Sequence, residues 1–122
     1  MDTKRDCANR SAVPEMSAAD ANRLFYAEYA ERYEEVEECV LDRRAQALLR
    51  DVLSKAVAAA PAAPGPGLRT LDACGGTGNA SFVLIRDLGV DETTVADISP
   101  EMLARCAARA AALGASIHTI ET

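Results

Sequence analysis

The sequence has few of the residues that build metal sites or disulfide frameworks. It contains one histidine, His118, and four cysteines, no two of which form a Cys-x-x-Cys pair. Structural zinc sites need closely spaced thiolate and imidazole ligands, and small disulfide-stabilised domains need a regular set of cysteines. We therefore expect no metal site and reduced thiols, as is typical of a cytoplasmic protein.

Long apolar runs and an excess of basic residues are also absent from the sequence. No stretch approaches the roughly 20 apolar residues that a membrane span requires. The first dozen residues mix acidic and basic side chains and lack the apolar centre of a signal peptide. The 13 Lys and Arg residues are outnumbered by 19 Asp and Glu residues, which gives a formal net charge of −6. Because a surface of that sign repels phosphate backbones, we expect no nucleic-acid partner. Since a long apolar run and a signal-peptide pattern are absent from the sequence, we expect no membrane span and a cytoplasmic location.

With 49% hydrophobic residues the chain has a globular composition, and its 122 residues divide into four segments. Residues 1–17 are polar without periodicity, and we expect a disordered arm there. Residues 18–60 carry apolar side chains at helical spacing, and an acidic cluster predicts a break between two helices near residues 32–36. Three prolines and two glycines at 61–67 predict a linker. Residues 68–122 alternate between strand and helix patterns.

This last segment predicts an α/β unit. We expect strands at 68–73, 93–97 and 115–120 and helices at 79–88 and 99–113. Parallel strands joined by helices form right-handed crossovers, so we expect strand order 3-2-1 in a Rossmann-like parallel half-sheet, preceded by N-terminal helices. The side of the second helix that faces the sheet is expected to carry Leu103, Cys106, Ala107, Ala110 and Leu113.

A glycine-rich turn between the first strand and the first helix of this unit is the strongest functional signal. The sequence there is Leu71-Asp72-Ala73-Cys74-Gly75-Gly76-Thr77-Gly78-Asn79. Glycines let the main chain bend sharply and approach a ligand closely, and the N–H groups that start the next helix favour negatively charged ligand groups. The stretch is typical of a nucleotide-type binding turn.

A second signal, Asp97, ends the next strand about 20 residues after the turn. In this type of fold such a carboxylate accepts hydrogen bonds from a ribose diol. A dinucleotide motif would place glycine where this sequence has Ser81, and the carboxylate of Asp72 would repel a pyrophosphate but suit an ammonium group. S-adenosylmethionine, a zwitterionic nucleoside, is therefore favoured over NAD, with an NAD(P)-dependent oxidoreductase as the alternative.

Two stretches resemble the first two motifs of class I S-adenosylmethionine-dependent methyltransferases, in particular those of ubiquinone and menaquinone biosynthesis. They read Leu71-Asp72-x-x-Gly75-Gly76-Thr77-Gly78 and Ala96-Asp97-Ile98-Ser99-Pro100-Glu101-Met102-Leu103. Upstream, the segment 24–33 resembles the N-terminal helix that lies over the cofactor in that family; it reads Leu24-Phe25-Tyr26-x-x-Tyr29-Ala30-x-x-Tyr33. The resemblance implies a methyltransferase that uses S-adenosylmethionine and a small-molecule methyl acceptor.

The resemblance also implies how the turn would bind the amino-acid end of that cofactor. Asp72 and the main chain of Gly76 and Gly78 would hold the methionine moiety. Thr77 would line the same turn, and Tyr33 would approach the methionine end.

At the nucleoside end, the resemblance implies that Asp97 binds the ribose hydroxyls and that Ile98 packs against the adenine. Cys74 belongs to the same cofactor site and stands where the family usually has glycine. Because no histidine is near it in the sequence, we expect a structural thiol there rather than a nucleophile. No residue is assigned a catalytic role.

A complete class I methyltransferase sheet continues beyond its third strand, whereas this sequence ends at Thr122. We therefore expect a truncated class I methyltransferase fold, an N-terminal cofactor-binding fragment with little activity alone. One edge of the first strand and the apolar side of the 79–88 helix would then be uncovered, which predicts self-association through the exposed sheet edge. The alternative from another class is a non-catalytic binding or partner module that another chain completes.

Overall fold

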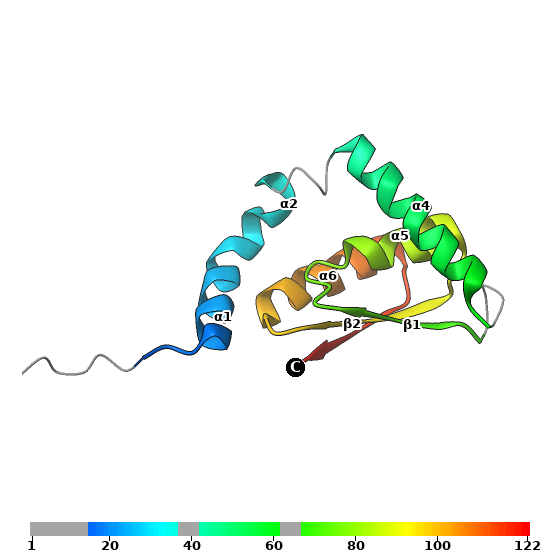
Figure 1. The fold of residues 1–122 in the computed structure, drawn as a ribbon. Helices are drawn as coiled ribbons and strands as arrows, with labels where there is room; N and C mark the ends of the chain where they lie inside the picture. Colours follow the sequence, from blue (N-terminus) through cyan, green and yellow to red (C-terminus); the bar gives the residue numbers. More distant parts are fainter. Residues whose placement is uncertain (1–14, 37–41, 62–66) are drawn as a thin grey trace, which may run out of the picture.

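The computed structural model describes residues 15–36, 42–61 and 67–122 (Figure 1). The expected arm at 1–17 and linker at 61–67 therefore lie largely outside the described residues. Within them the chain forms helices and a three-stranded sheet. None of the described helices has the length and apolar composition needed to cross a membrane.

The sheet is parallel and has the predicted order of neighbours. Its strands are β1 (Arg69–Ala73), β2 (Glu92–Asp97) and β3 (Ile117–Glu121), with β2 in the middle. The register places Ala73 opposite Ala96 and Asp97 opposite Glu121, so the three strands end at the same edge. The predicted bounds were within two residues of those observed.

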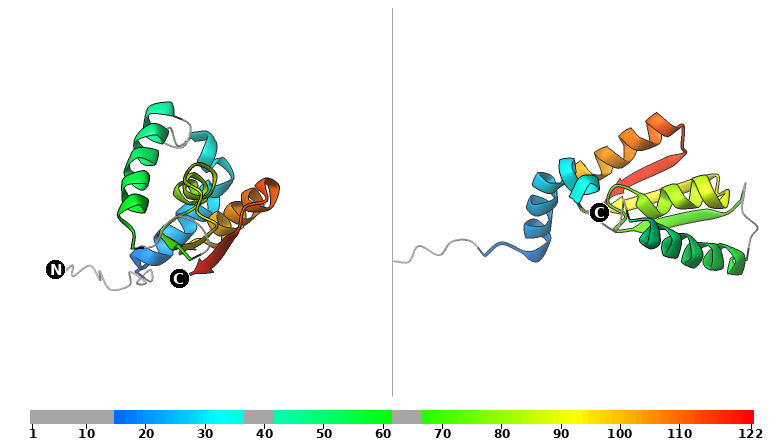
Figure 2. Two further views of the ribbon diagram at one scale, coloured as in Figure 1. Left: turned by 90° about the vertical axis from the view of Figure 1, so that its right-hand side faces the viewer. Right: turned by 90° about the horizontal axis from the view of Figure 1, so that it is seen from above.

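Two helices cover one face of this sheet, α5 (Asn79–Leu88) and α6 (Pro100–Leu113) (Figures 1 and 2). Ser99 caps α6, because its Oγ accepts a hydrogen bond from the N–H of Met102. Gly114 ends α6 with a φ of 62°, a left-handed conformation that glycine adopts without steric cost. The core between these helices and the sheet is formed by Phe82, Val95, Leu103, Cys106 and Ala110.

The buried stripe of α6 differs from the predicted one. Met102, Leu103, Cys106 and Ala110 are buried, whereas Ala107 is exposed. Leu113 is 62% exposed because it is the last residue of the helix, where packing is incomplete.

A longer helix, α4 (Arg43–Ala59), packs along α5 on the side opposite α6 (Figure 2). Asp42 caps it, with Oδ1 accepting hydrogen bonds from the N–H groups of Arg44 and Ala45, both at 2.8 Å. The expectation that the apolar side of the 79–88 helix is uncovered was therefore wrong. With α4 in place, Val83 and Leu84 of α5 are buried.

The N-terminal helical segment stands beside the carboxyl ends of the strands (Figure 1). It comprises α1 (Ala18–Tyr29), a 3₁₀ turn η1 (Ala30–Arg32) and α2 (Tyr33–Val36). Next to the predicted break at 32–36, the tighter η1 turn separates α1 from α2, and helical turns continue through Val36. Residues 37–41 lie outside the described residues, and the next described helix begins at Arg43.

The other face of the sheet is not covered by any described element (Figure 1). Leu71 of β1 is 67% exposed and Ile120 of β3 is 52% exposed. Among the described residues β1 pairs only with β2, so its second edge carries unpaired main-chain groups.

Candidate functional site

The turn between β1 and α5 has an unusual backbone. Cys74, Gly76 and Gly78 all have positive φ angles, of 58°, 54° and 83°. Within the turn the N–H of Gly78 donates to the carbonyl oxygen of Gly75 at 2.8 Å. The N–H of Gly75 donates to the carbonyl oxygen of Ala96 at 3.1 Å, which anchors the turn to β2. Left-handed residues in this pattern fold the chain back before α5 begins.

Close packing explains why glycines occupy this turn. A Cβ at Gly78 would lie 2.6 Å from Sγ of Cys106, and one at Gly75 would lie 2.7 Å from Cγ of Asp72. Real Cβ atoms do not approach other heavy atoms this closely. The turn is therefore pressed between α6 on one side and the end of β1 on the other.

Asp97, at the end of β2, is hydrogen-bonded to the main chain of the turn. Its Oδ2 accepts a hydrogen bond from the N–H of Gly76, and its Oδ1 accepts one from the N–H of Ser99, both at 2.9 Å. The carboxylate thus joins the two loops that follow β1 and β2. Each carboxylate oxygen has two lone pairs, so Asp97 retains acceptor capacity for a ligand hydroxyl.

Asp72 lies behind Gly75 of the turn and is hydrogen-bonded to the start of α5. Its Oδ2 accepts hydrogen bonds from Oγ of Ser81 at 2.8 Å and from the N–H of Ser81 at 3.3 Å. The Oγ of Ser81 also lies 3.4 Å from Oγ1 of Thr93, so the serine is part of a buried polar cluster. This gives a structural reason for serine where a dinucleotide motif has glycine.

A cavity of about 520 Å³ opens at the carboxyl ends of β1 and β2, beside the N-terminal helices. Pockets of this size hold small-molecule ligands. Its lining is formed by Asn22, Tyr26, Tyr33, Ala73, Cys74, Gly75, Gly76, Ala96, Asp97, Ile98, Met102 and Thr122.

The cavity brings together four of the seven predicted cofactor residues: Cys74, Gly76, Asp97 and Ile98. The other three do not line the cavity: Thr77 and Gly78 belong to the turn, and Asp72 belongs to β1. Thr77 is buried and its carbonyl oxygen accepts a hydrogen bond from Arg109, at 3.2 Å. The structure therefore divides the predicted set into a lining group and a supporting group.

Aromatic side chains from the N-terminal helices close one side of the cavity. Tyr26 and Tyr33 both line it, and their ring centroids lie 6.5 Å apart in an edge-to-face arrangement. α1 is tied to the loop after β2 because Nε of Arg23 donates to the carbonyl oxygen of Ile98 at 3.2 Å. The sequence motif at 24–33 contains both tyrosines but gave only Tyr33 a place at the cofactor, and the cavity contact of Asn22 was not predicted.

The chemistry of the lining favours a ligand with an apolar body and donor groups. Asp97 is the one ionisable carboxylate among the described side chains that line the cavity. Apolar and aromatic side chains make up much of the remaining lining. In a partly enclosed site of this kind, a carboxylate is matched best by hydroxyl or cationic groups of the ligand.

The sequence model of the ubiE/COQ5 methyltransferase family matches residues 20–121. No curated protein matches the chain. Several solved structures match part of it. YjhP from E. coli is 26% identical over 80% of this chain with a TM-score of 0.54. PH0226 from Pyrococcus horikoshii is 20% identical over 75% with a TM-score of 0.55. The (4+2)-cyclase SpnF is 25% identical over 64% with a TM-score of 0.52.

The matched region is a minor part of those structures. It covers 36% of YjhP, 42% of PH0226 and 27% of SpnF. The chain therefore spans less than half the length of these solved proteins. At 20% sequence identity, the similarity to PH0226 shows a common fold only.

Proposed function

The chain belongs to the ubiE/COQ5 methyltransferase family, and from that membership we propose that its cavity binds S-adenosylmethionine for methyl transfer to a small-molecule acceptor. The observation that carries the proposal is the meeting of the glycine turn and Asp97 at one cavity. The N–H of Gly76 donates to Oδ2 of Asp97, and both residues line the space beside Ile98. A glycine turn and a carboxylate at neighbouring strand ends are how doubly wound folds bind nucleoside cofactors.

The residues at the cavity fit the two ends of such a cofactor. Asp97 has acceptor capacity for the ribose hydroxyls, and Ile98 supplies an apolar surface for the adenine. Cys74 and the main chain of Gly76 face the space that the methionine end would occupy, with Tyr33 across from the strand ends. Because side chains at Gly75 and Gly78 would clash with Asp72 and Cys106, these positions are occupied by glycine and do not obstruct the turn.

Asp72, Thr77 and Gly78 support the binding surface in this proposal. The carboxylate of Asp72 lies behind Gly75, where its charge favours an ammonium group on the other side of the turn and opposes a pyrophosphate. This supports S-adenosylmethionine over NAD, in agreement with family membership. An NAD(P)-dependent oxidoreductase is therefore the less favoured alternative.

When bound, S-adenosylmethionine supplies an electrophilic methyl group on its sulfonium. The described residues of this chain bind and orient, and none of them is assigned as a general base or nucleophile. Alignment of methyl donor and acceptor in one cavity is itself a large contribution to rate. We propose that turnover by this chain alone is low.

A second candidate is a cofactor-binding module that associates with another chain or with itself. It is supported by the open sheet face, on which Leu71 and Ile120 are exposed, and by the unpaired edge of β1. SpnF, named as a (4+2)-cyclase, illustrates that this fold serves reactions other than methyl transfer. A mass measurement in solution separates a monomer from an associated form.

We also propose a cytoplasmic location. Cys74 is an exposed thiol that forms no disulfide among the described residues. An exposed unpaired thiol is typical of proteins in a reducing compartment.

Calorimetric titration with S-adenosylmethionine, S-adenosylhomocysteine and NAD tests the cofactor assignment. The proposal predicts saturable binding of both S-adenosyl compounds and weaker binding of NAD. Tighter binding of NAD would contradict it. Incubation with radiolabelled S-adenosylmethionine and small-molecule acceptors then tests transfer itself.

A further inference from the structure

One side chain that the family motifs do not include, Arg109 of α6, contacts the glycine turn directly. Its Nη1 donates to the carbonyl oxygen of Thr77 at 3.2 Å. The same atom lies 3.5 Å from Oγ1 of Thr77. The guanidinium carbon lies 4.3 Å from the centroid of the Phe82 ring on α5. Arg109 therefore joins α6, the turn and the first turns of α5.

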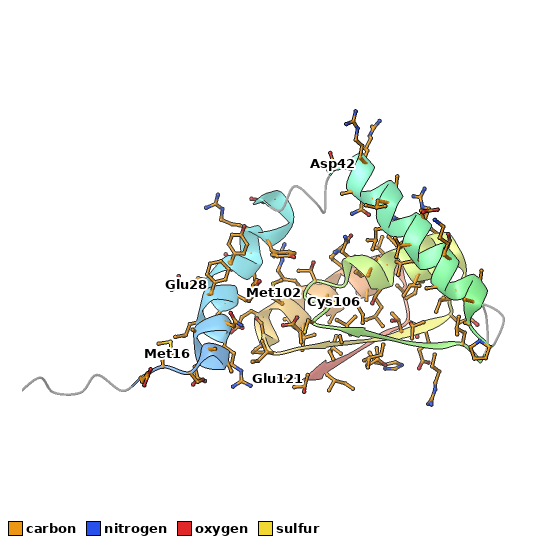
Figure 3. The ribbon with its side chains drawn as sticks, viewed as in Figure 1. Met16, Glu28, Asp42, Met102, Cys106 and Glu121 are labelled. Carbon is orange, nitrogen blue, oxygen red and sulfur yellow. The ribbon has the colours of Figure 1, made fainter. Side chains whose placement is uncertain are left out.

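Arg109 is one of three residues that α6 presents to the turn. Met102, Cys106 and Arg109 follow one another at spacings of four and three residues and so lie on one face of the helix. A Cβ at Gly76 would lie 3.0 Å from Cε of Met102, and one at Gly78 would lie 2.6 Å from Sγ of Cys106. Figure 3 shows Met102 and Cys106 on α6.

The turn needs such support because glycine adopts many backbone conformations, so contacts must select the observed one. Gly76 and Gly78 both have left-handed φ angles, and Thr77 lies between them with its side chain buried. Asp97 holds the N–H of Gly76 on the cavity side, while Arg109 holds the carbonyl of Thr77 on the helix side. The two contacts act on the 75–76 and 77–78 peptide units, which flank the 76–77 peptide. A hydrogen bond from a charged donor is stronger than one between neutral groups.

We propose that Arg109 is a positioning residue for cofactor binding: it fixes the peptide between Thr77 and Gly78 so that the turn presents a preformed surface to the methionine end of the cofactor. The inference rests on the proposed function for its ligand. The contact of Arg109 with the turn is independent of that function. A preformed surface binds more tightly because less conformational freedom is lost on binding.

Three variants of the full chain test this. Arg109→Met keeps a long side chain beside Phe82 but removes the donor to Thr77. Arg109→Lys keeps a charged donor without the planar group. Arg50→Met is the matched control, because Arg50 makes an ion pair of 3.0 Å with Asp87, near the other end of α5.

The first readout is the affinity for S-adenosylhomocysteine by calorimetry. Arg109→Met is expected to bind about tenfold more weakly than wild type, Arg109→Lys is expected to recover part of the loss, and Arg50→Met is expected to match wild type. Wild-type affinity in Arg109→Met would overturn the inference. Equal loss in Arg50→Met would also overturn it, because the effect would then be one of general stability.

The second readout, amide hydrogen exchange in the ligand-free chain, does not depend on the cofactor. Arg109→Met is expected to accelerate exchange at Gly76 and Gly78, whose N–H groups are bonded within the site, but not at Leu84 in the middle of α5. Uniform acceleration or no change would overturn the role of Arg109. If wild type binds no S-adenosyl compound, the proposed function fails, and exchange alone decides whether Arg109 holds the turn.

Discussion

Asp97 and Gly76 are 21 positions apart in the sequence and are joined by a hydrogen bond of 2.9 Å from the Gly76 N–H to Oδ2 of Asp97. The bond links the carboxyl ends of two neighbouring parallel strands. It makes Asp97 both a candidate ligand for the ribose and a part of the turn that would hold the other end of the cofactor. Removing this carboxylate therefore has consequences for stability as well as for binding.

Asp97→Ala is expected to lower the free energy of unfolding by about 2 kcal/mol, because the N–H groups of Gly76 and Ser99 lose their acceptor in a buried region. Binding of S-adenosylhomocysteine is expected to be lost in the same variant. Urea unfolding and calorimetry measure the two effects. Asp91→Ala, at an exposed position before β2, is the control. An Asp97→Ala chain with wild-type stability and affinity would refute both roles.

Gly78 and Cys106 are expected to be energetically coupled. Gly78→Ala is expected to cost about 2 kcal/mol, because the residue has a φ of 83° and the new Cβ would meet Sγ of Cys106. In the double variant with Cys106→Ala the clash is removed and only the backbone cost remains. A double-mutant cycle of unfolding free energies is expected to show a coupling of about 1 kcal/mol. Simple additivity would contradict the close contact.

Asp87 on α5 gives a pH-dependent contribution to stability. The pKa of Asp87 lies below its ordinary value of 3.8, mainly because Arg86 donates a hydrogen bond to its carboxylate. Partial burial opposes this shift and Arg50 adds to it. A lowered folded-state pKa stabilises the fold above the unfolded-state pKa, and this contribution disappears as the pH falls through the folded-state value.

Asp87→Asn is therefore expected to cost about 0.5 kcal/mol at neutral pH, a small value because both arginines are more than half exposed. The difference from wild type is expected to shrink below about pH 4. Urea unfolding at several pH values measures it. A difference that stays constant across the acid range would exclude this ion pair as its source.

The open sheet face is expected to mediate self-association. Leu71 is opposite Thr94, which is opposite His118, so these three residues lie on one face of the sheet. Ile120 follows His118 by two residues and therefore lies on the same face. Leu71→Lys combined with Ile120→Lys is expected to reduce the apparent mass in size-exclusion chromatography and the binding of a hydrophobic dye. Leu48→Lys, at a 65% exposed leucine on α4, is the control. Equal effects in the control would show that the sheet face is not special.

Local patterns predicted most of the α/β unit. The helix at 79–88 was predicted at its observed bounds, because Gly78 and Gly89 stop the helical pattern at both ends. Asp97 was predicted from its spacing after the glycine turn and Ile98 from the family resemblance, and both line the cavity.

Features that depend on tertiary packing were not predicted from the sequence. The cover of α5 by α4 is a contact between two separate helices, which no local pattern encodes. Asp72 contacts Ser81, and Arg109 contacts Thr77. Because residues of these polar types are mostly found on protein surfaces, the sequence alone does not indicate such contacts. The prediction that Asp72 contacts the methionine end therefore stays a prediction, although the structure places its carboxylate beneath the turn.

The central claim is that the cavity between the turn and Asp97 binds an S-adenosyl ligand. The most direct test is a titration of the isotope-labelled chain with S-adenosylhomocysteine, followed by amide chemical shifts. The account predicts saturable shifts at Gly76, Ile98 and Ser99, with little change in α4. Shifts confined to the open sheet face, or no saturable shifts at millimolar ligand, would contradict it.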